Sequence, residues 1–303
     1  MSVTLAQAAL LSNDVLLKGI IETIIKESPI LARMPFIEIN GNALTYNREL
    51  ALAGMEWHAA NDVWTESAPT WEQKTASLTI LGGDADVDNF IRQTRSNIQD
   101  IEAAVIELKT KALIHEYEDK FLYGDGLANV FEGLIKLINT AAASDQLIAT
   151  AAAGNTALTL SMVDQLIDAV LGGKPDMLMM SKRTRRKLTA LMRAAGTFYE
   201  MRDEFGMWIQ TYNGIPVLVN DWIKNTHHLA SSVEDSYTSG TDSSIYAFTL
   251  GEGALAGVSN GMIQIERLGS LETKDATRTR IKFYCGLALF NVKKAAALVG
   301  IAA

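Results

Sequence analysis

Cysteine is nearly absent from this sequence, and long apolar runs are missing. The single cysteine, Cys285, excludes an intrachain disulfide and a cysteine zinc cluster, and its apolar surroundings favour a small buried side chain. Without a run of about 18 apolar residues, the sequence predicts no membrane-spanning helix. The N-terminus has no basic leader, so we expect no secretion signal and synthesis in a reducing cytoplasm.

Positive charge is also in short supply. The 303 residues carry 27 Lys and Arg against 35 Asp and Glu, for a formal net charge of −8. Proteins that bind nucleic acid through its phosphates are usually basic, so this charge balance disfavours tight binding to nucleic acid and to an anionic membrane surface. With 48% hydrophobic residues, the chain can bury the core of one large domain or of two modest ones.

Motifs of catalysis are scarce as well. The sequence has no Walker loop, no G-x-S-x-G and no H-E-x-x-H. Residues 251–256 match G-x-G-x-x-A, but the glycines that follow would break the helix needed to hold a pyrophosphate, so a nucleotide-binding enzyme stays a remote alternative. A zinc site on a helix needs ligands at i and i+4, where His115 has only Asp119, and the adjacent His227 and His228 lie in a polar loop. We therefore predict no catalytic, cofactor or metal site.

The most unusual stretch is residues 42–88. Residues 43–50 and 74–87 are strand-like, and the residues between them show no period. That middle holds three of the chain's five tryptophans, Trp57, Trp64 and Trp71. A long two-stranded hairpin has no core of its own to bury them. Two interpretations stay open: a hairpin packed on its own domain, or an arm that reaches over a neighbouring subunit.

A long amphipathic helix is expected next. Ser96 and Gln99 form a capping box and Gly124 ends the pattern, which predicts about 24 helical residues, or roughly 36 Å. The expected apolar stripe is Ile98, Ile101, Val105, Leu108 and Ala112. The expected polar face is Glu102, Glu107, Lys109, Lys111 and Glu118. A helix of this kind lies across other elements instead of passing through a core.

An alternating α/β region follows an alanine-rich boundary at residues 139–155. It contains an expected helix near 161–171, a strand at 177–180, a basic helix at 182–194 and a hairpin over 208–219 turned at Asn213-Gly214. Beyond a polar loop at 224–244 we expect strands at 245–250, 262–268 and 278–289 and a buried apolar C-terminus at 295–303. The basic run 182–187 leaves open nucleic acid, a solvated face or acids of a neighbour.

Two short passages carry a resemblance. Phe121-Leu122-Tyr123-Gly124-Asp125-Gly126 is followed by Phe131-Glu132-Gly133-Leu134-Ile135, and Asn213-Gly214-Ile215-Pro216-Val217 is followed by Asn220-Asp221. Taken with the order of parts, from arm through hairpin, long helix and α/β region to returning strands, they make the chain resemble the major capsid proteins of tailed bacteriophages (Caudoviricetes). That family has the Hong Kong 97 fold, and the resemblance covers essentially the whole chain.

The resemblance implies an α+β fold of four parts. These are an N-terminal arm (1–41), an extended hairpin loop (42–88), a peripheral domain with the long spine helix (89–138 and 251–303) and an axial domain (139–250). It also implies pentamers and hexamers that close an icosahedral shell in the virion, after synthesis in the host bacterial cytoplasm. Expected partners are a portal, a separate scaffold or decoration protein, and enclosed DNA without sequence-specific binding; no membrane, cofactor or enzymatic activity is implied. An encapsulin-like nanocompartment shell stays as the alternative.

The same resemblance suggests where subunits meet. On the hairpin the implied contacts are Arg48, Glu49, Trp57, Trp64 and Trp71. On the loop 269–277 and the strand after it they are Glu272, Lys274, Arg278 and Arg280. The polar loop 224–244 would lie near the capsomer centre. Residues 269–277 offer no asparagine as a partner for Lys74, so we predict no isopeptide crosslink.

Overall fold

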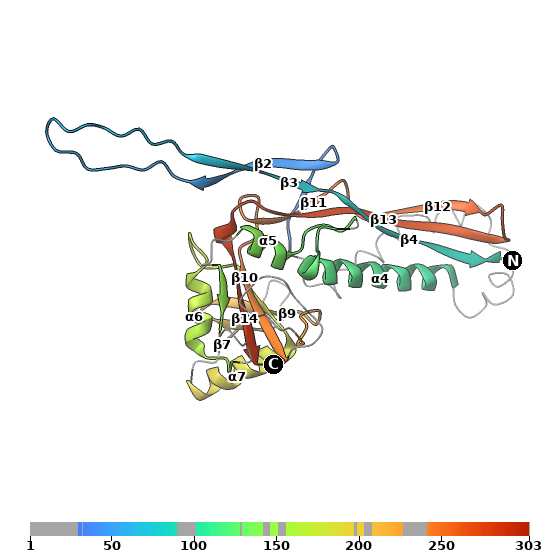
Figure 1. The fold of residues 1–303 in the computed structure, drawn as a ribbon. Coiled ribbons are helices and arrows are strands. Elements are labelled where there is room, and N and C mark those ends of the chain that lie inside the picture. Colours follow the sequence, from blue (N-terminus) through green and yellow to red (C-terminus); the bar gives the residue numbers. More distant parts are fainter. Residues whose placement is uncertain are drawn as a thin grey trace.

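The computed structural model describes residues 30–31, 33–89, 101–127, 129–141, 146–150, 156–196, 199–202, 208–226 and 241–302. Figure 1 shows three parts. An arm is formed by β2 (Ala43–Ala51) and β3 (Thr70–Ser77). An elongated body places a five-stranded sheet along α4 (Ile101–Tyr123), and a compact body surrounds a seven-stranded sheet. The arm and the elongated body extend to opposite sides of the compact body (Figure 1).

The sheet of the elongated body is organised by β13 (Ala276–Leu289), a strand of 14 residues. One edge of β13 pairs antiparallel with β4 (Thr79–Asp88), and the other edge pairs with β12 (Gln264–Ser270) and then β11 (Leu255–Ser259). β1 (Phe36–Glu38) adds in parallel to β11. The alternation expected along this strand is confirmed, because its inward side chains are buried: Ile281, Phe283, Cys285 and Leu287.

α4 packs along this sheet, but with a different face from the expected one. Its buried residues include Ile106, Leu113, Tyr117 and Phe121. Leu108, expected to point inward, is 66% exposed, so that part of the predicted stripe is wrong. The helix contacts β4, β13 and α5 (Leu134–Ala141), so its buried residues do not follow one straight line.

The predictions for the two ends of α4 have different outcomes. The helix ends at Tyr123, which confirms the stop predicted at Gly124. The capping box at Ser96 and Gln99 lies outside the described residues. Glu118 was expected on the polar face, but it is 1% exposed, because it turns toward the compact body.

The compact body is built on a sheet in the order β5-β14-β10-β6-β9-β8-β7. In chain order these strands are β5 (Leu147–Ala149), β6 (Met177–Met180), β7 (Tyr199–Arg202), β8 (Trp208–Tyr212), β9 (Ile215–Val219), β10 (Asp242–Phe248) and β14 (Ala295–Ala302). Met177 and Met179 join the core shared with α4 and α5, whereas Leu178 and Met180 join the core under α6 (Leu160–Asp168) and α7 (Lys182–Ala194). Helices therefore cover both faces of this sheet.

Several local predictions in this body are confirmed. β6 and α7 have the predicted bounds. The structure adds a cap that was not predicted, because Ser181 Oγ accepts a hydrogen bond from the Thr184 N–H at 3.3 Å. The turn between β8 and β9 places Asn213 at φ 50° and Gly214 at φ 80°. These left-handed values are those of the hairpin turn that an Asn-Gly pair favours.

The C-terminus corrects one part of the expected domain division. Residues 251–303 were grouped with the long helix, but β14 pairs with β10 and β5 inside the compact body. Its apolar side chains are buried there, between the two layers of helices. A short 3-10 turn at Val292–Lys294 carries the chain from one body to the other.

Two expected features fall largely outside the described residues. Of the N-terminal arm at 1–41, only residues 30–31 and 33–41 are described. Of the polar loop at 224–244, residues 227–240 are not, and they include His227 and His228.

A buried polar contact joins the two bodies, and a close backbone approach joins the end of α4 to the start of α5. Asn220 Nδ2 donates a hydrogen bond to Glu118 Oε2 at 2.7 Å, and the Asn220 N–H donates to the Met180 carbonyl at 3.0 Å. The Gly133 N–H donates to the Gly124 carbonyl at 2.8 Å, and a Cβ on Gly133 would overlap the Gly124 nitrogen. The glycines of the passage at 121–135 are therefore needed for two backbones to touch.

Candidate assembly surfaces

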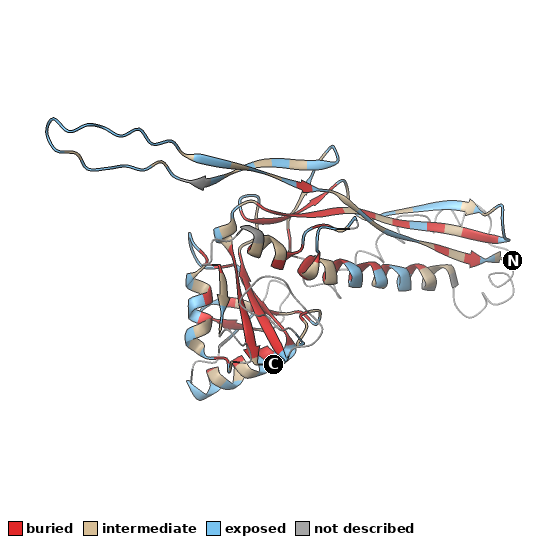
Figure 2. Cartoon of the chain, in the orientation of Figure 1, coloured by how far each residue is buried: buried red, intermediate tan, exposed pale blue. Residues whose placement is uncertain are grey.

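The arm exposes large apolar side chains and has no core. Residues 52–69 between β2 and β3 form no strand, and Figure 2 shows this tip almost entirely exposed. Trp57 is 104% exposed, Trp64 79% and Trp71 71%. The structure therefore brings the three predicted tryptophans together on one excursion, away from the chain's own cores.

The tip is acidic as well as aromatic. Residues 52–69 include Glu56, Asp62 and Glu66 but no lysine or arginine. His58 stacks on Trp64 with ring centroids 4.4 Å apart, and its Nδ1 lies 3.6 Å from Asp62 Oδ2. These local contacts give the tip some shape without burying the outer tryptophan, Trp57.

Sequence reasoning missed three further apolar side chains of the tip. Leu52, Met55 and Val63 are each more than four-fifths exposed. The signal available in the sequence was the spacing of these apolar residues, which follows neither the two-residue period of a strand nor the 3.6-residue period of a helix.

Charge pairs stiffen the root of the arm. Arg48 Nη2 lies 2.6 Å from Glu72 Oε2 across the strand pair, and Lys74 Nζ lies 2.9 Å from Glu72 Oε1. Hydrogen bonds from Arg48 and then Lys74 lower the pKa of the Glu72 carboxyl from its ordinary value. Arg48 thus has a partner within its own chain, whereas Glu49, opposite Trp71 in the strand register, is exposed.

One tyrosine fixes the arm to the elongated body. Tyr46 donates a hydrogen bond from its hydroxyl to the Leu289 carbonyl at 3.0 Å, and its ring centroid lies 4.7 Å from that of Phe290. Desolvation by burial raises the pKa of this tyrosine above its ordinary value. The arm therefore leaves the body in a set direction although its tip is unsupported.

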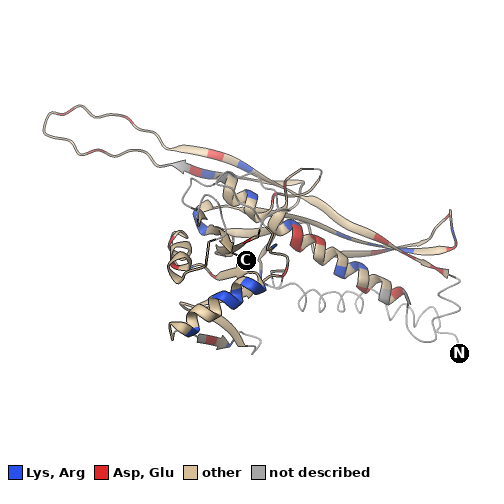
Figure 3. Cartoon of the chain, turned by 60° about the horizontal axis from the view of Figure 1, so that its bottom comes forward, with Lys and Arg blue, Asp and Glu red and all other residues tan. Residues whose placement is uncertain are grey.

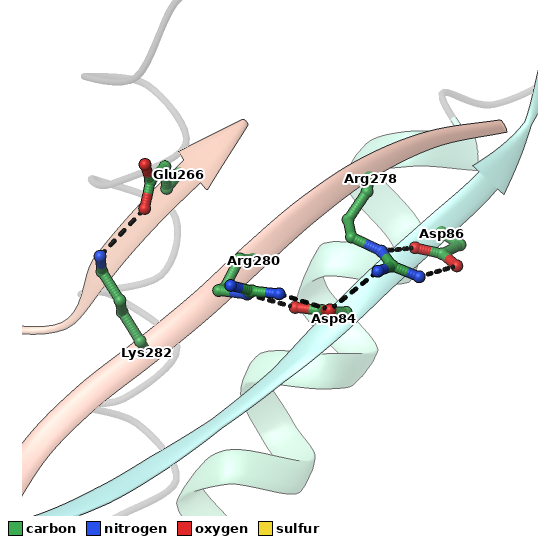
Figure 4. A network of polar contacts seen from close by, with 6 residues as sticks. All are labelled: Asp84, Asp86, Glu266, Arg278, Arg280 and Lys282. Atoms are coloured by element: carbon green, nitrogen blue, oxygen red, sulfur yellow. Dashed lines mark hydrogen bonds and ion pairs between the residues drawn. The ribbon is translucent and has the colours of Figure 1, made fainter. Parts of the chain in front are cut away.

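A charge ladder occupies the β4–β13 pair at the far end of the elongated body; we use this name for Asp84, Asp86, Arg278 and Arg280 (Figure 4). Arg278 donates to both oxygens of Asp86 at 2.6 and 2.8 Å, and Arg280 donates to both oxygens of Asp84 at 2.7 and 2.9 Å. A further Arg278 nitrogen lies 3.4 Å from Asp84, so the two pairs are linked. Forked pairs of this kind are the strong form of a surface ion pair.

The electrostatics of the ladder follow from these contacts. The hydrogen bond from Arg280 lowers the pKa of Asp84, and hydrogen bonds from Arg278 and then Lys274 hold the pKa of Asp86 far below its usual range. Lys274 Nζ lies 2.6 Å from Asp86. Three of the four residues predicted to contact neighbours here are thus paired within the chain, and Glu272 is exposed on the adjoining loop.

The described residues offer no sign of catalysis. After Gly251 the chain turns and enters β11 at Leu255, where a dinucleotide site would begin a helix. Desolvation by burial raises the pKa of the Cys285 thiol to about 12, which makes it unreactive. Within the described part of the chain, no group of three or more His, Cys, Asp or Glu could hold a metal ion, and no helix is long and apolar enough to cross a membrane.

Comparison with known families decides the identity of this architecture. A sequence profile described as the phage capsid family matches residues 8–300. The chain belongs to the phage capsid family. As a phage major capsid protein it forms the icosahedral head from many copies of itself, and its role is structural and not enzymatic. A comparison with curated proteins finds no match.

Solved structures show the same Hong Kong 97 type of fold at low identity. The holo-SrpI encapsulin complex from Synechococcus elongatus PCC 7942 is 14% identical with a TM-score of 0.67, covering 100% of this chain and 97% of that one. The capsid of a native GTA particle is 14% identical with a TM-score of 0.65, covering 90% of both chains. A chain of Mycobacterium phage Bobi is 15% identical with a TM-score of 0.62, also covering 90% of both.

Proposed function

We propose that this capsid protein forms pentamers and hexamers in which the arm of each subunit lies over its neighbour. The observation that carries the proposal is the tip at 52–69, where Trp57 and Trp64 are exposed on an excursion without a core. Large exposed aromatic side chains of this kind mark protein contacts. Buried aromatic anchors usually dominate the energy of an interface.

The root of the arm supports this role by setting its direction. Tyr46 holds it to the elongated body, and Arg48 bridges its two strands through Glu72. Stiffness before contact lowers the entropy lost on docking. In this proposal Arg48 orders the arm, whereas Glu49 and Trp71, exposed opposite one another in register, meet the neighbour.

We assign the far end of the elongated body to contacts between neighbouring capsomers. The charge ladder stiffens β4 and β13, and the loop between β12 and β13 presents Glu272 and Lys274 beyond it. Although Arg280 already pairs with Asp84, 45% of its side chain stays exposed. Its guanidinium group can therefore also bind an acidic side chain of another copy.

The parts of the fold receive corresponding roles. The elongated body with α4 acts as a peripheral domain, and the compact body, now including β14, acts as an axial domain that meets its copies at the capsomer centre. The polar loop at 224–244 would lie near that centre. Residues 1–41 would form a second, N-terminal arm. A portal and a separate scaffold or decoration protein would complete the particle in the host cytoplasm. DNA is enclosed without sequence-specific recognition.

The mass of the native protein tests this proposal first. Size-exclusion chromatography with light scattering, followed by negative-stain microscopy, should show closed shells or rings of five and six subunits. A stable monomer or dimer at every concentration and salt would contradict the proposal.

An encapsulin-like shell is the second candidate, favoured by the full coverage of the encapsulin complex in the structural comparison. The two candidates differ in what their particles contain. Particles purified from the native source should hold nuclease-protected DNA if the chain encloses a phage genome. A protein cargo in place of that DNA would favour the encapsulin.

A further inference from the structure

Positive charge is concentrated on α7. The 13 residues of this helix include no aspartate or glutamate, although the whole chain carries a net charge of −8. Its basic residues are Lys182, Arg183, Arg185, Arg186, Lys187 and Arg193. Figure 3 shows the blue of Lys and Arg concentrated on the ribbon of this helix, on the side of the compact body that comes forward in that view. No other described helix carries so one-sided a charge.

The inward face and two of the cations are already engaged. Thr184, Leu188 and Met192 are buried against the sheet. Lys187 donates a hydrogen bond to the Ala302 carbonyl at 2.6 Å, and Lys182 forms an ion pair with Asp221.

Three further arginines lie near the start of the helix. Arg183, Arg185 and Arg186 are exposed, and none of them has an ion-pair partner among the residues that the structure describes. Arg183 and Arg185 occupy the first turn of the helix, where its dipole disfavours cations, and no acidic residue of that turn offsets them; Arg186 follows in the next turn. Mutual repulsion adds to that cost. An external polyanion would relieve both penalties.

The chemistry of the chain favours a phosphate backbone over a second copy as that polyanion. The acids of the charge ladder and Glu72 already pair with cations of their own chain. The arm tip offers a neighbour three carboxylates, Glu56, Asp62 and Glu66, and Asp62 lies 3.6 Å from His58 of its own chain. Guanidinium groups bind phosphate oxygens in a forked manner, and a duplex offers about one negative charge per 1.7 Å of its axis.

We propose that the exposed face of α7 contacts the phosphates of the enclosed DNA without sequence preference. The inference rests on the proposed function as a shell around DNA. α7 lies at the end of the compact body away from the arm (Figure 1), so the chain's own arm does not cover it. In an acidic wall this helix provides a weak, salt-sensitive contact, whereas the rest of the wall repels the duplex.

Salt-dependent binding of a labelled duplex tests the inference on the unassembled chain. The probe is a fluorescent DNA duplex of arbitrary sequence, followed by anisotropy from 50 to 200 mM salt. The variant R183Q/R185Q/R186Q removes three phosphate contacts and should lower the slope of log K against log salt by about 2.7. Over that range the wild-type affinity should then fall about 40-fold more than that of the variant.

A matched control separates the helix from net charge. K109Q/K174Q/K293Q removes the same charge from exposed positions outside α7 and should keep the wild-type slope. An equal loss of slope in this control, or no binding by the wild type at 50 mM salt, would overturn the inference. A second duplex of unrelated sequence should behave like the first, and a strong sequence preference would also overturn it.

Assembly, followed by light scattering, is the separate readout for the proposed shell. A wild type that never assembles but shows the slope difference would refute the shell and leave the α7 contact standing. A triple variant that binds DNA like the wild type yet fails to assemble would show that α7 meets acids of another copy, which refutes the DNA contact.

Discussion

The tip of the arm makes the sharpest prediction, because replacing Trp57 by alanine should weaken assembly and leave the subunit unchanged. Trp57 is fully exposed and touches neither of the two large cores. Its removal therefore costs the free subunit no packing, and surface changes of this kind alter stability by no more than about 0.5 kcal/mol. Any larger effect must come from contacts made after subunits meet.

The expected magnitude follows from the exposed area. Burying a tryptophan removes about 200 Å² from water, worth about 5 kcal/mol at about 25 cal/mol per Å². The entropy lost when the side chain is ordered, and the area that an alanine would still bury, reduce the expected loss of contact energy to about 3 kcal/mol per contact. Each subunit would donate one arm, so the critical concentration for assembly should rise about 100-fold.

Light scattering against protein concentration measures that critical concentration, and thermal melting of the unassembled subunit checks the fold. Trp57→Phe keeps an aromatic anchor and is the matched control, with a rise well below that of Trp57→Ala. Trp64→Ala should act similarly but less than additively with Trp57→Ala, because the two lie in one loop. A critical concentration within threefold of the wild type for Trp57→Ala would refute the arm as an interface.

Three further predictions concern the subunit itself. Asn220→Ala leaves the buried Glu118 carboxylate without one donor and should cost about 2–3 kcal/mol in urea unfolding; a loss below about 0.5 kcal/mol would contradict the buried contact. Gly133→Ala forces two backbones apart and should cost about 1–3 kcal/mol, whereas Gly83→Ala, facing open space, should cost far less. The lowered aspartate pKa values mean that the charge ladder stabilises the fold above about pH 4 and that this is lost as the pH falls further. Asp84→Asn should therefore flatten the fall of melting temperature between pH 4 and 2, and an unchanged fall would count against the ladder.

Local chemistry made much of this fold predictable. The spacing of the inward residues Leu188 and Met192 indicated α7, and an Asn-Gly pair indicated the β8–β9 turn, because each signal involves neighbours in sequence. Gly124 ended α4 as expected for the same reason.

Tertiary contacts decided the rest. Glu118 is buried because the compact body contacts that side of α4, and Leu108 is exposed although its spacing predicted burial. The register that places Arg278 opposite Asp86 joins positions 192 apart, which no local pattern encodes. β14 joins the compact sheet for the same reason, since strand pairing over long distances leaves no local signal.

The same long pairing has a consequence for synthesis. The partner of β4 is β13, and the hydroxyl of Thr79 bonds a carbonyl 206 positions later. At roughly 5–20 residues per second, a ribosome needs about 10–40 s to cover that distance. During that time β4 has an unpaired edge, and the arm lacks the residues near the C-terminus that anchor Tyr46. Many copies of the chain are in this state at once in the cell. Nascent chains are therefore the stage at which this protein is most exposed to aggregation, and the stage at which a chaperone would help it most.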